Sequence, residues 1–309
     1  MSQAFSERAS ADRVVAALER SVECAERGIT TLPIVVATPD DLALLDAEDV
    51  RPQLDRVMLG QYADLGLDSL LATGMLDALL PEVKAMVGFG DGEWRHKDVW
   101  KHTKQVVTQA TEQLEVRWAA LFHDIGKVRT RSISPNGEVH FFGHAEVGAR
   151  MFDKMERREK LFAREETLRA EIRFLVLHHL RASQYDGSWT DSAVRRFARD
   201  MGPYLADLMC LSRADITTKR PEKKRRGIAM IDELAQRITQ LAAEDAKQPP
   251  LPTGIGNEIM KAFGLPPSRK IGDIKRALEA AVDAGEVPGF EDAGYYVQYL
   301  AENRERFGL

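Results

Sequence analysis

Cysteine is scarce in this chain of 309 residues. Cys24 and Cys210 are its only two cysteines, and neither has a second cysteine nearby. Disulfide scaffolds and zinc–thiolate sites both need several cysteines at short spacings, so both are excluded. A reducing compartment suits this composition, and we expect a cytoplasmic protein.

Long apolar runs are missing as well. No stretch approaches the roughly 18 uninterrupted apolar residues of a membrane helix, and the N-terminal residues MSQAFSERASADRVV lack the apolar core of a secretion signal. Hydrophobic residues nevertheless make up 44% of the chain, which excludes a disordered protein. We expect a globular protein that neither spans a membrane nor is secreted.

The chain has no excess of basic residues. Its 43 lysines and arginines face 48 acidic residues, for a net charge of −5. This balance argues against a protein that coats nucleic acid indiscriminately, but it permits a local basic patch.

Alternating β-branched residues are rare. Apolar residues recur at steps of three and four instead, as Val14, Leu18 and Val22 illustrate. The one strand-like run, TLPIVVATP at residues 31–39, is too short to define a sheet. We therefore predict an all-α fold, with a helical segment from about residue 54 to 80.

Capping residues, turn residues and prolines indicate where helices and domains begin and end. Asp98 is placed to cap a helix, and the ISPNG segment at residues 133–137 has the composition of a turn. Three prolines within four residues of the DAKQPPLPTG segment, residues 245–254, mark a domain boundary. Beyond it we expect a small helical module with a helix from about Gly272 to Ala284.

Histidine is concentrated in one part of the chain. All seven histidines, including His96 and His140, lie within residues 96–179, where about two would fall by chance. Imidazoles combined with carboxylates suit divalent ions of iron, manganese, cobalt, nickel or zinc. The clustering predicts a metal site, although we assign His96 and His140 no role in it.

The pair His123-Asp124 ends the apolar segment WAALFHDIGK. A carboxylate buried there needs a partner or a metal, because its desolvation otherwise costs several kcal/mol. The alternative is that the two side chains bond each other and cap the helix.

In the order of these residues the chain resembles the HD superfamily of metal-dependent phosphohydrolases. The segments that carry the resemblance are WKHT, FHDIGK, FGHAEVGA, LVLHHL and SRADIT. In that family a lone histidine, a His-Asp doublet and a distal aspartate bind a divalent ion, and two further histidines hold a second ion that the doublet's aspartate bridges. The resemblance implies one or two ions of Mn, Fe, Co, Ni, Zn or Mg, with the first bound by His102, His123, Asp124 and Asp215 and the second by Asp124, His144 and His179.

Other side chains near these motifs are candidates for binding phosphate. Lys127 follows the doublet by three residues, a spacing that can place its ammonium beside a bound phosphate, although a solvated lysine at a helix end is the alternative. Arg181 follows the histidine pair and is a second candidate. The apolar periodicity does not decide between His178 and His179 as the ligand; the resemblance favours His179 and leaves His178 for the substrate.

Residues 59–309 also resemble the helical body of bacterial CCA-adding tRNA nucleotidyltransferases and their poly(A)-polymerase-like relatives. Beyond the metal-site motifs, the resemblance rests on the segments LLATGMLDALLPEV and FGLPPSRKIGDIKRALEAAVDAGEVPG. It implies an N-terminal helical segment at residues 1–58, an HD domain at 59–245 and a C-terminal module at 246–309. Residues 1–58 lack the Gly-Ser turn of a nucleotidyltransferase head, so we expect the HD metal site to be the centre of activity.

A basic run follows the proposed ligand Asp215. Such a concentration of charge attracts phosphates, which makes RNA or tRNA a candidate partner, although a solvated helix start is the alternative. The residues expected to contact nucleic acid are Lys219, Arg220, Lys223, Lys224, Arg225 and Arg226.

The resulting expectation is a phosphohydrolase in which a metal-activated hydroxide attacks a phosphoester, with Asp124 and Lys127 as catalytic residues. The substrate class is a nucleotide or an RNA end, a 2′,3′-cyclic phosphate being one candidate. A non-catalytic RNA-binding protein with a structural metal is the main alternative. A di-iron oxygenase is a third reading, because HD-type oxygenases share the six-ligand pattern.

Overall fold

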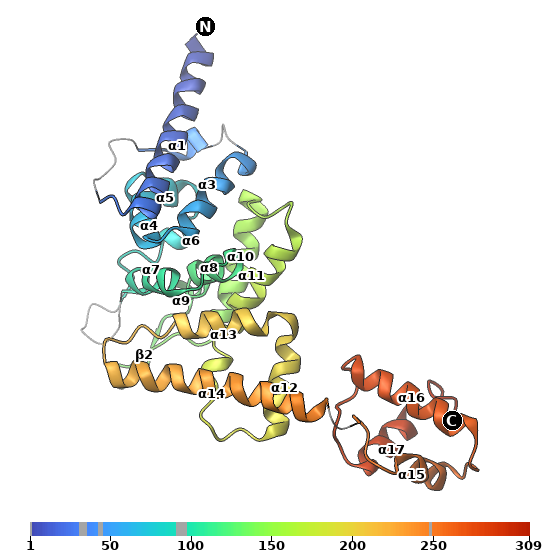
Figure 1. The fold of residues 1–309 in the computed structure, drawn as a ribbon. Coiled ribbons are helices and arrows are strands. Elements are labelled where there is room, and N and C mark those ends of the chain that lie inside the picture. Colours follow the sequence, from blue (N-terminus) through green and yellow to red (C-terminus); the bar gives the residue numbers. More distant parts are fainter. Residues whose placement is uncertain (1, 31–35, 43–45, 91–97, 247–248) are drawn as a thin grey trace. The chain divides into compact units, whose positions relative to one another are not determined.

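The computed structural model describes residues 2–30, 36–42, 46–90, 98–246 and 249–309. The predicted all-α class is confirmed, since helices dominate and two strands of two residues each form the one sheet among these residues (Figure 1). None of the described helices is both long enough and apolar enough to cross a membrane. The chain divides into two compact units, residues 1–189 with 201–235 and residues 190–200 with 236–309. The predicted boundaries at residues 58 and 245 stay predictions.

The first unit begins with a layer formed by the N-terminal helices of the chain. They are α1 (Ser2–Arg27), α2 (Pro39–Leu42), α3 (Ala47–Leu59), α4 (Ala63–Ala72), α5 (Met75–Leu79) and α6 (Pro81–Lys84). At Gly66 the helices α1 and α4 approach so closely that a Cβ there would lie 2.6 Å from the Cβ of Ala25. This layer supports the helices that follow.

The segment predicted to be helical over residues 54–80 is divided among three helices, α3, α4 and α5. The chain breaks between α3 and α4, where the backbone N–H of Tyr62 donates to the carbonyl of Ala25 (2.8 Å), and again at Gly74. Gly74 has a φ of +77°, a left-handed conformation that suits glycine and ends α4. The strand-like run is not a strand at residues 36–38, and residues 31–35 lie outside the described part.

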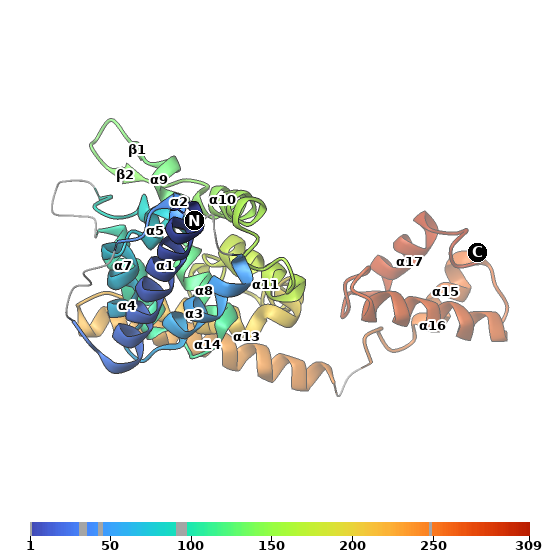
Figure 2. The same cartoon turned by 90° about the horizontal axis from the view of Figure 1, so that it is seen from above.

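Around helix α8 (Leu114–Phe122) lies the second layer of this unit, and α8 contacts α3, α7, α11 and α13 (Figure 2). Every side chain from Val116 to Phe122 is buried. Phe122 and Phe152 pack edge to face with their ring centroids 5.2 Å apart, which gives a rigid aromatic core next to the end of α8. The surrounding elements are α7 (Val99–Gln109), α9 (Lys127–Thr130), β1 (Ser132–Ile133), β2 (Val139–His140), α10 (His144–Glu159), α11 (Glu166–His178), η1 (Ala182–Gln184), η2 (Gly202–Tyr204) and α13 (Leu205–Ala214).

Two local predictions are confirmed here. The carboxylate of Asp98 accepts a hydrogen bond from the backbone N–H of Lys101 (3.2 Å) and caps α7. The turn at residues 133–137 joins the antiparallel strands β1 and β2, with Ser132 opposite His140 and Gly137 at a φ of +82°.

Two helices have residues in both units: α12 (Asp191–Met201) and α14 (Pro221–Asp245). The second unit contains most of α12, the end of α14, and α15 (Ile255–Phe263), α16 (Arg269–Asp283) and α17 (Ala293–Glu302). Its core includes Ile259, Leu278 and Leu300, and α16 starts three residues earlier than predicted.

Candidate metal centre

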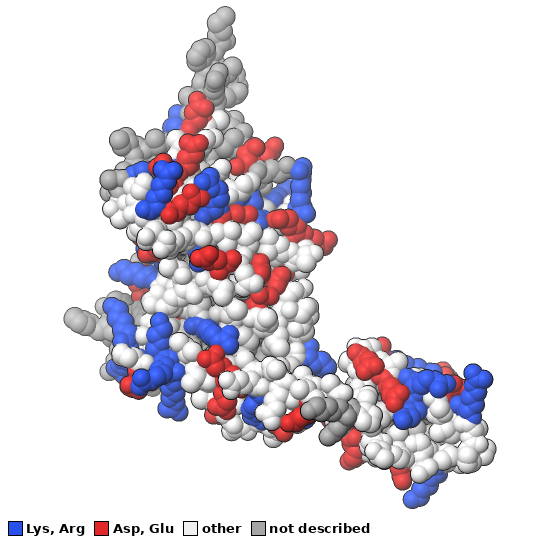
Figure 3. Space-filling view, viewed as in Figure 1, with Lys and Arg blue, Asp and Glu red and all other residues white. Residues whose placement is uncertain are grey.

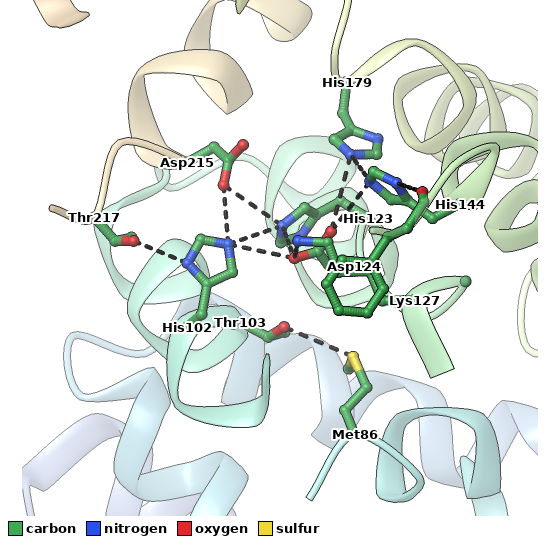
Figure 4. Close-up of polar contacts among 12 residues, drawn as sticks. Met86, His102, Thr103, His123, Asp124, Lys127, His144, His179, Asp215 and Thr217 are labelled. Atoms are coloured by element: carbon green, nitrogen blue, oxygen red, sulfur yellow. Dashed lines mark hydrogen bonds and ion pairs between the residues drawn. The ribbon is translucent and has the colours of Figure 1, made fainter. Parts of the chain in front are cut away.

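Six side chains from five different elements meet in the first unit (Figure 4). His102 lies within α7, three residues after its start, whereas the other five stand at helix ends. His123 and Asp124 follow α8, His144 begins α10, His179 follows α11, and Asp215 follows α13.

One half of the cluster joins His102, His123, Asp124 and Asp215. Nε2 of His102 lies 3.0 Å from Oδ1 of Asp215 and 3.4 Å from Oδ2 of Asp124. Nε2 of His123 lies 3.2 Å from the same Asp124 oxygen and 3.6 Å from Oδ1 of Asp215. The two Nε2 atoms are themselves only 3.3 Å apart.

The other half joins Asp124 to His144 and His179. The second oxygen of Asp124, Oδ1, lies 3.5 Å from Nε2 of His144 and 4.0 Å from Nε2 of His179, and these two nitrogens are 3.1 Å apart. Asp124 is only 1% exposed and turns one oxygen to each half. Its carboxylate is therefore placed as a bridge between two groups of imidazoles.

The hydrogen bonds of Nδ1, the outer ring nitrogen that points away from the cluster, determine how the histidine rings are oriented. Nδ1 of His123, of His144 and of His179 each donates to the carbonyl oxygen three residues earlier, at 2.8 Å. A carbonyl can only accept, so Nδ1 of each of these rings carries a proton, and Nε2 carries a lone pair whenever the ring is neutral. The Nε2 lone pairs of His144 and His179, whose nitrogens are 3.1 Å apart, repel unless a proton or a cation lies between them.

Nitrogen and carboxylate donors of this kind suit a divalent transition ion. Two groups of ligand atoms lie close enough together to hold such an ion, within 4.8 Å of one another: those of His102, His123 and Asp124, and those of Asp124, His144 and His179. Hydrogen bonds from the outer nitrogen of a ligating histidine are the usual companions of a metal site.

The charges of the cluster are strongly interdependent. Burial opposes protonation of His123, but the carboxylates of Asp124 and Asp215 outweigh it and raise its pKa to about 10. Burial, reinforced by the charge on His123, lowers the pKa of His179 to about 4, and burial also lowers the pKa of His144. Burial works against ionisation of Asp124 too, yet the adjacent His123 and Lys127 hold its pKa well below the usual range. Without a metal, the centre thus holds a proton on His123 between two carboxylates, where a cation is favoured.

Lys127 is the cation nearest to the bridging carboxylate. Its Nζ donates to Oδ2 of Asp124 at 2.6 Å and lies 5.7 Å from the ring centroid of Phe141. Lys127 begins α9 and is half-buried, so its ammonium can reach both Asp124 and a group bound at the centre.

The remaining predicted site residues differ in their positions. His178 is half-buried with its ring centroid 4.3 Å from that of Phe174, whereas His179 is the neighbour that joins the cluster. Arg181 is half-buried, and its backbone N–H donates to the carbonyl of His178 (2.8 Å). His140 lies on β2 against Ser134, and His96 lies outside the described residues.

Close packing at Gly126 supports the second half of the centre. A Cβ at this position would lie 2.0 Å from the carbonyl oxygen of His144 and 2.7 Å from the backbone nitrogen of Gly148. Only glycine therefore lets the turn after α8 approach the start of α10 so closely. Sequence reasoning did not single out Gly126 for this role, because a glycine after a helix is usually a simple stop signal.

The predicted basic cluster, Lys219 to Arg226, lies at the start of α14, where lysine and arginine gather on the surface (Figure 3). All of its cations are exposed except Lys224, which is half-buried and donates from Nζ to Oε1 of Gln109 (3.1 Å). Gln109 in turn donates from Nε2 to the carbonyl of Ala214 (2.8 Å), next to Asp215. The start of α14 is thus tied to α7 and to the segment that carries a predicted metal ligand.

The chain is similar to a known domain family and to several known proteins. The HD domain family matches residues 99–220. The A-adding tRNA nucleotidyltransferase of Deinococcus radiodurans is 33% identical over 263 residues, which cover 82% of this chain and 58% of that protein. The CC-adding tRNA nucleotidyltransferase of Thermus thermophilus is 31% identical over 271 residues, which cover 85% and 59%. The multifunctional CCA protein of Ectopseudomonas mendocina is 32% identical over 131 residues, which cover 40% and 31%. The chain therefore spans a little over half the length of the first two relatives.

Proposed function

We propose that this chain is a metal-dependent phosphohydrolase of nucleotide or RNA-end phosphoesters, because residues 99–220 match the HD domain family and most of the chain is similar to tRNA nucleotidyltransferases. The observation that carries the proposal is the buried carboxylate of Asp124, with one oxygen toward each group of imidazoles. A carboxylate in this position would allow the two groups of imidazoles to hold two ions at one reaction centre.

The protein's own residues hold and neutralise the reacting groups. His102, His123 and Asp215 would hold one ion with Asp124, and His144 and His179 would hold the other. The chemistry that bound ions would supply there is polarisation of a phosphoryl oxygen and a lower pKa of a bound water. Lys127 would bind an equatorial phosphate oxygen with its ammonium, and Arg181 is the second candidate for this charge neutralisation.

The substrate class follows from chemistry near the centre. The cations at the start of α14 favour a polyanion, and they are tied through Gln109 to the segment next to Asp215. The relatives are named for acting on tRNA, so the 3′ end of an RNA, including a 2′,3′-cyclic phosphate, is the first substrate to test.

The test is hydrolysis of a panel of phosphomonoesters and of 2′,3′- and 3′,5′-cyclic nucleotides. Metal-stripped protein is supplied in turn with manganese, cobalt, nickel and magnesium. We expect metal-dependent turnover that is lost in Asp124→Ala and retained in His140→Ala, whose histidine contacts Ser134 instead of the cluster. Unchanged turnover in Asp124→Ala would refute the site assignment.

A non-catalytic RNA-binding protein with a structural metal is the second candidate, favoured by the exposed cations of the basic cluster. It predicts salt-dependent binding of a tRNA-like RNA that weakens when Lys223, Arg225 and Arg226 are changed to glutamine. It also predicts no turnover of any ester with any of the metals. Turnover that depends on Asp124 would decide for the phosphohydrolase.

A further inference from the structure

His102 differs from the other three histidines of the centre in the partner of its outer nitrogen. His123, His144 and His179 donate to a backbone carbonyl within their own turn. Nδ1 of His102 instead lies 2.8 Å from the hydroxyl oxygen of Thr217, 115 residues further along the chain (Figure 4). Thr217 is only 5% exposed, and it follows Asp215 by two residues.

A hydroxyl group can both donate and accept, whereas a carbonyl can only accept. When Nε2 of His102 carries the proton, it donates to Oδ1 of Asp215 (3.0 Å), and Nδ1 accepts from the Thr217 hydroxyl. When Nε2 faces a metal, the proton moves to Nδ1, which then donates to the same hydroxyl oxygen. Thr217 can therefore satisfy His102 in both forms.

We propose that Thr217 is a positioning residue that orients His102 and sets the affinity of the metal ion bound by His102 and Asp215. The inference rests on the proposed metal centre and concerns one of its two halves. The segment from Asp215 to Thr217 brings to His102 both the carboxylate beside its inner nitrogen and the hydroxyl beside its outer nitrogen. The other half, with His144 and His179, is oriented by backbone carbonyls and does not depend on Thr217.

The discriminating variant is Thr217→Val, which keeps the shape of the side chain and removes the hydroxyl. The Nδ1–H of His102 then has no acceptor at this position, which favours the form with the proton on Nε2, where it competes with the metal. Loss of such an outer partner typically weakens metal binding roughly 10- to 100-fold. Thr217→Ser keeps the hydroxyl and should bind like the unmodified protein.

Metal-stripped full-length protein is titrated with Co²⁺, and binding is followed by absorbance and by competition with a chelator. We expect two binding steps, of which one weakens in Thr217→Val and returns in Thr217→Ser. Thr103→Val is the matched control, because Thr103 is a buried neighbour of His102 whose hydroxyl contacts Sδ of Met86 (3.7 Å) instead of a ligand. It should leave both steps unchanged.

Three results would overturn the inference. These are equal Co²⁺ affinity of Thr217→Val and the unmodified protein, equal weakening of both steps, and a Thr217→Ser variant that binds no better than Thr217→Val. Circular dichroism shows whether each variant is folded. If Thr217→Val does not fold, Thr217→Ser remains informative. The readout is metal affinity, so failure to hydrolyse any ester would refute the phosphohydrolase and leave this inference standing, whereas absence of any Co²⁺ binding would refute both.

Discussion

Replacing Gly126 by alanine tests whether close backbone packing holds the second half of the centre in place. The added Cβ would lie 2.0 Å from the carbonyl oxygen of His144 and 2.9 Å from its carbonyl carbon. A Cβ essentially never lies closer than 3.0 Å to another heavy atom, so the turn after α8 and the start of α10 must separate by about 1 Å. The atoms in the way are backbone atoms of α10, which cannot rotate aside as a side chain can.

The expected cost exceeds that of ordinary overpacking, which is about 1–3 kcal/mol. We expect the free energy of unfolding to fall by at least about 3 kcal/mol. A shift of the start of α10 also moves His144 relative to Asp124 and His179. In the unmodified protein the facing nitrogen and oxygen atoms of these three side chains lie 3.1–4.0 Å apart. The metal ion of this half should therefore bind less tightly, while the half with His102 and Asp215 changes little.

The matched control is Gly148→Ala in α10, on the facing side of the same contact. A Cβ at Gly148 would lie 3.5 Å from the nitrogen of Gly126 and 3.5 Å from Val176, which are ordinary contacts. Alanine is also preferred over glycine within a helix by about 1 kcal/mol, so this variant should be as stable as the unmodified protein or more stable. Urea unfolding in a chelator, followed by Co²⁺ titration, measures both effects. Equal unfolding midpoints for Gly126→Ala and Gly148→Ala would refute the reasoning.

Three further predictions concern the charges of the centre. In metal-free protein His179 has its pKa lowered by burial to about 4, against about 6.5 when unfolded, so its contribution is present above pH 6.5 and is lost, by about 3 kcal/mol, as the pH falls to 4. Burial opposes protonation of His123, but the carboxylates raise its pKa to about 10, so its contribution to stability is present below pH 6.5 and is lost as the pH rises to 10. Urea unfolding should therefore show maximal stability near pH 6.5. A flat profile would contradict both pKa shifts. Metal binding at pH 8 should release about one proton from His123, measurable by calorimetry in buffers of different ionisation enthalpy; an unchanged release in His123→Gln would place the proton elsewhere. Lys127→Gln should lower kcat by roughly 100-fold, because it removes the ammonium that would bind a phosphate oxygen. It should not weaken metal binding, because Lys127 is a cation beside Asp124 and not a metal ligand. A parallel loss of metal would refute a role in binding phosphate.

Features that depend on near neighbours in the chain could be read from the sequence. The helical class follows from apolar residues at steps of three and four, and the cap at Asp98 needs only a backbone N–H three residues away. The ordered motifs around His102, His123, Asp124, His144, His179 and Asp215 named the side chains that meet in the structure. Such motifs are recognisable because a metal site demands particular residue types, whatever separates them along the chain.

Contacts between distant segments were decided by the tertiary structure. The assignment of one Asp124 oxygen to each half depends on how α8, α10 and α11 pack, as does the orientation of His179 rather than His178 into the cluster. The break at Gly74 comes from a single left-handed residue that the apolar periodicity of residues 54–80 does not reveal.

Gly126 and Thr217 show most clearly that contacts between distant segments cannot be read from the sequence. In the sequence they are a glycine after a helix and a threonine in a loop, and neither type is distinctive at such positions. Their roles come from atoms far along the chain, the carbonyl of His144 for Gly126 and the imidazole of His102 for Thr217. The sequence by itself therefore determined which elements form and which residue types could bind a metal, while packing decided which atoms face one another, because distances of 2–4 Å between remote residues depend on the whole fold.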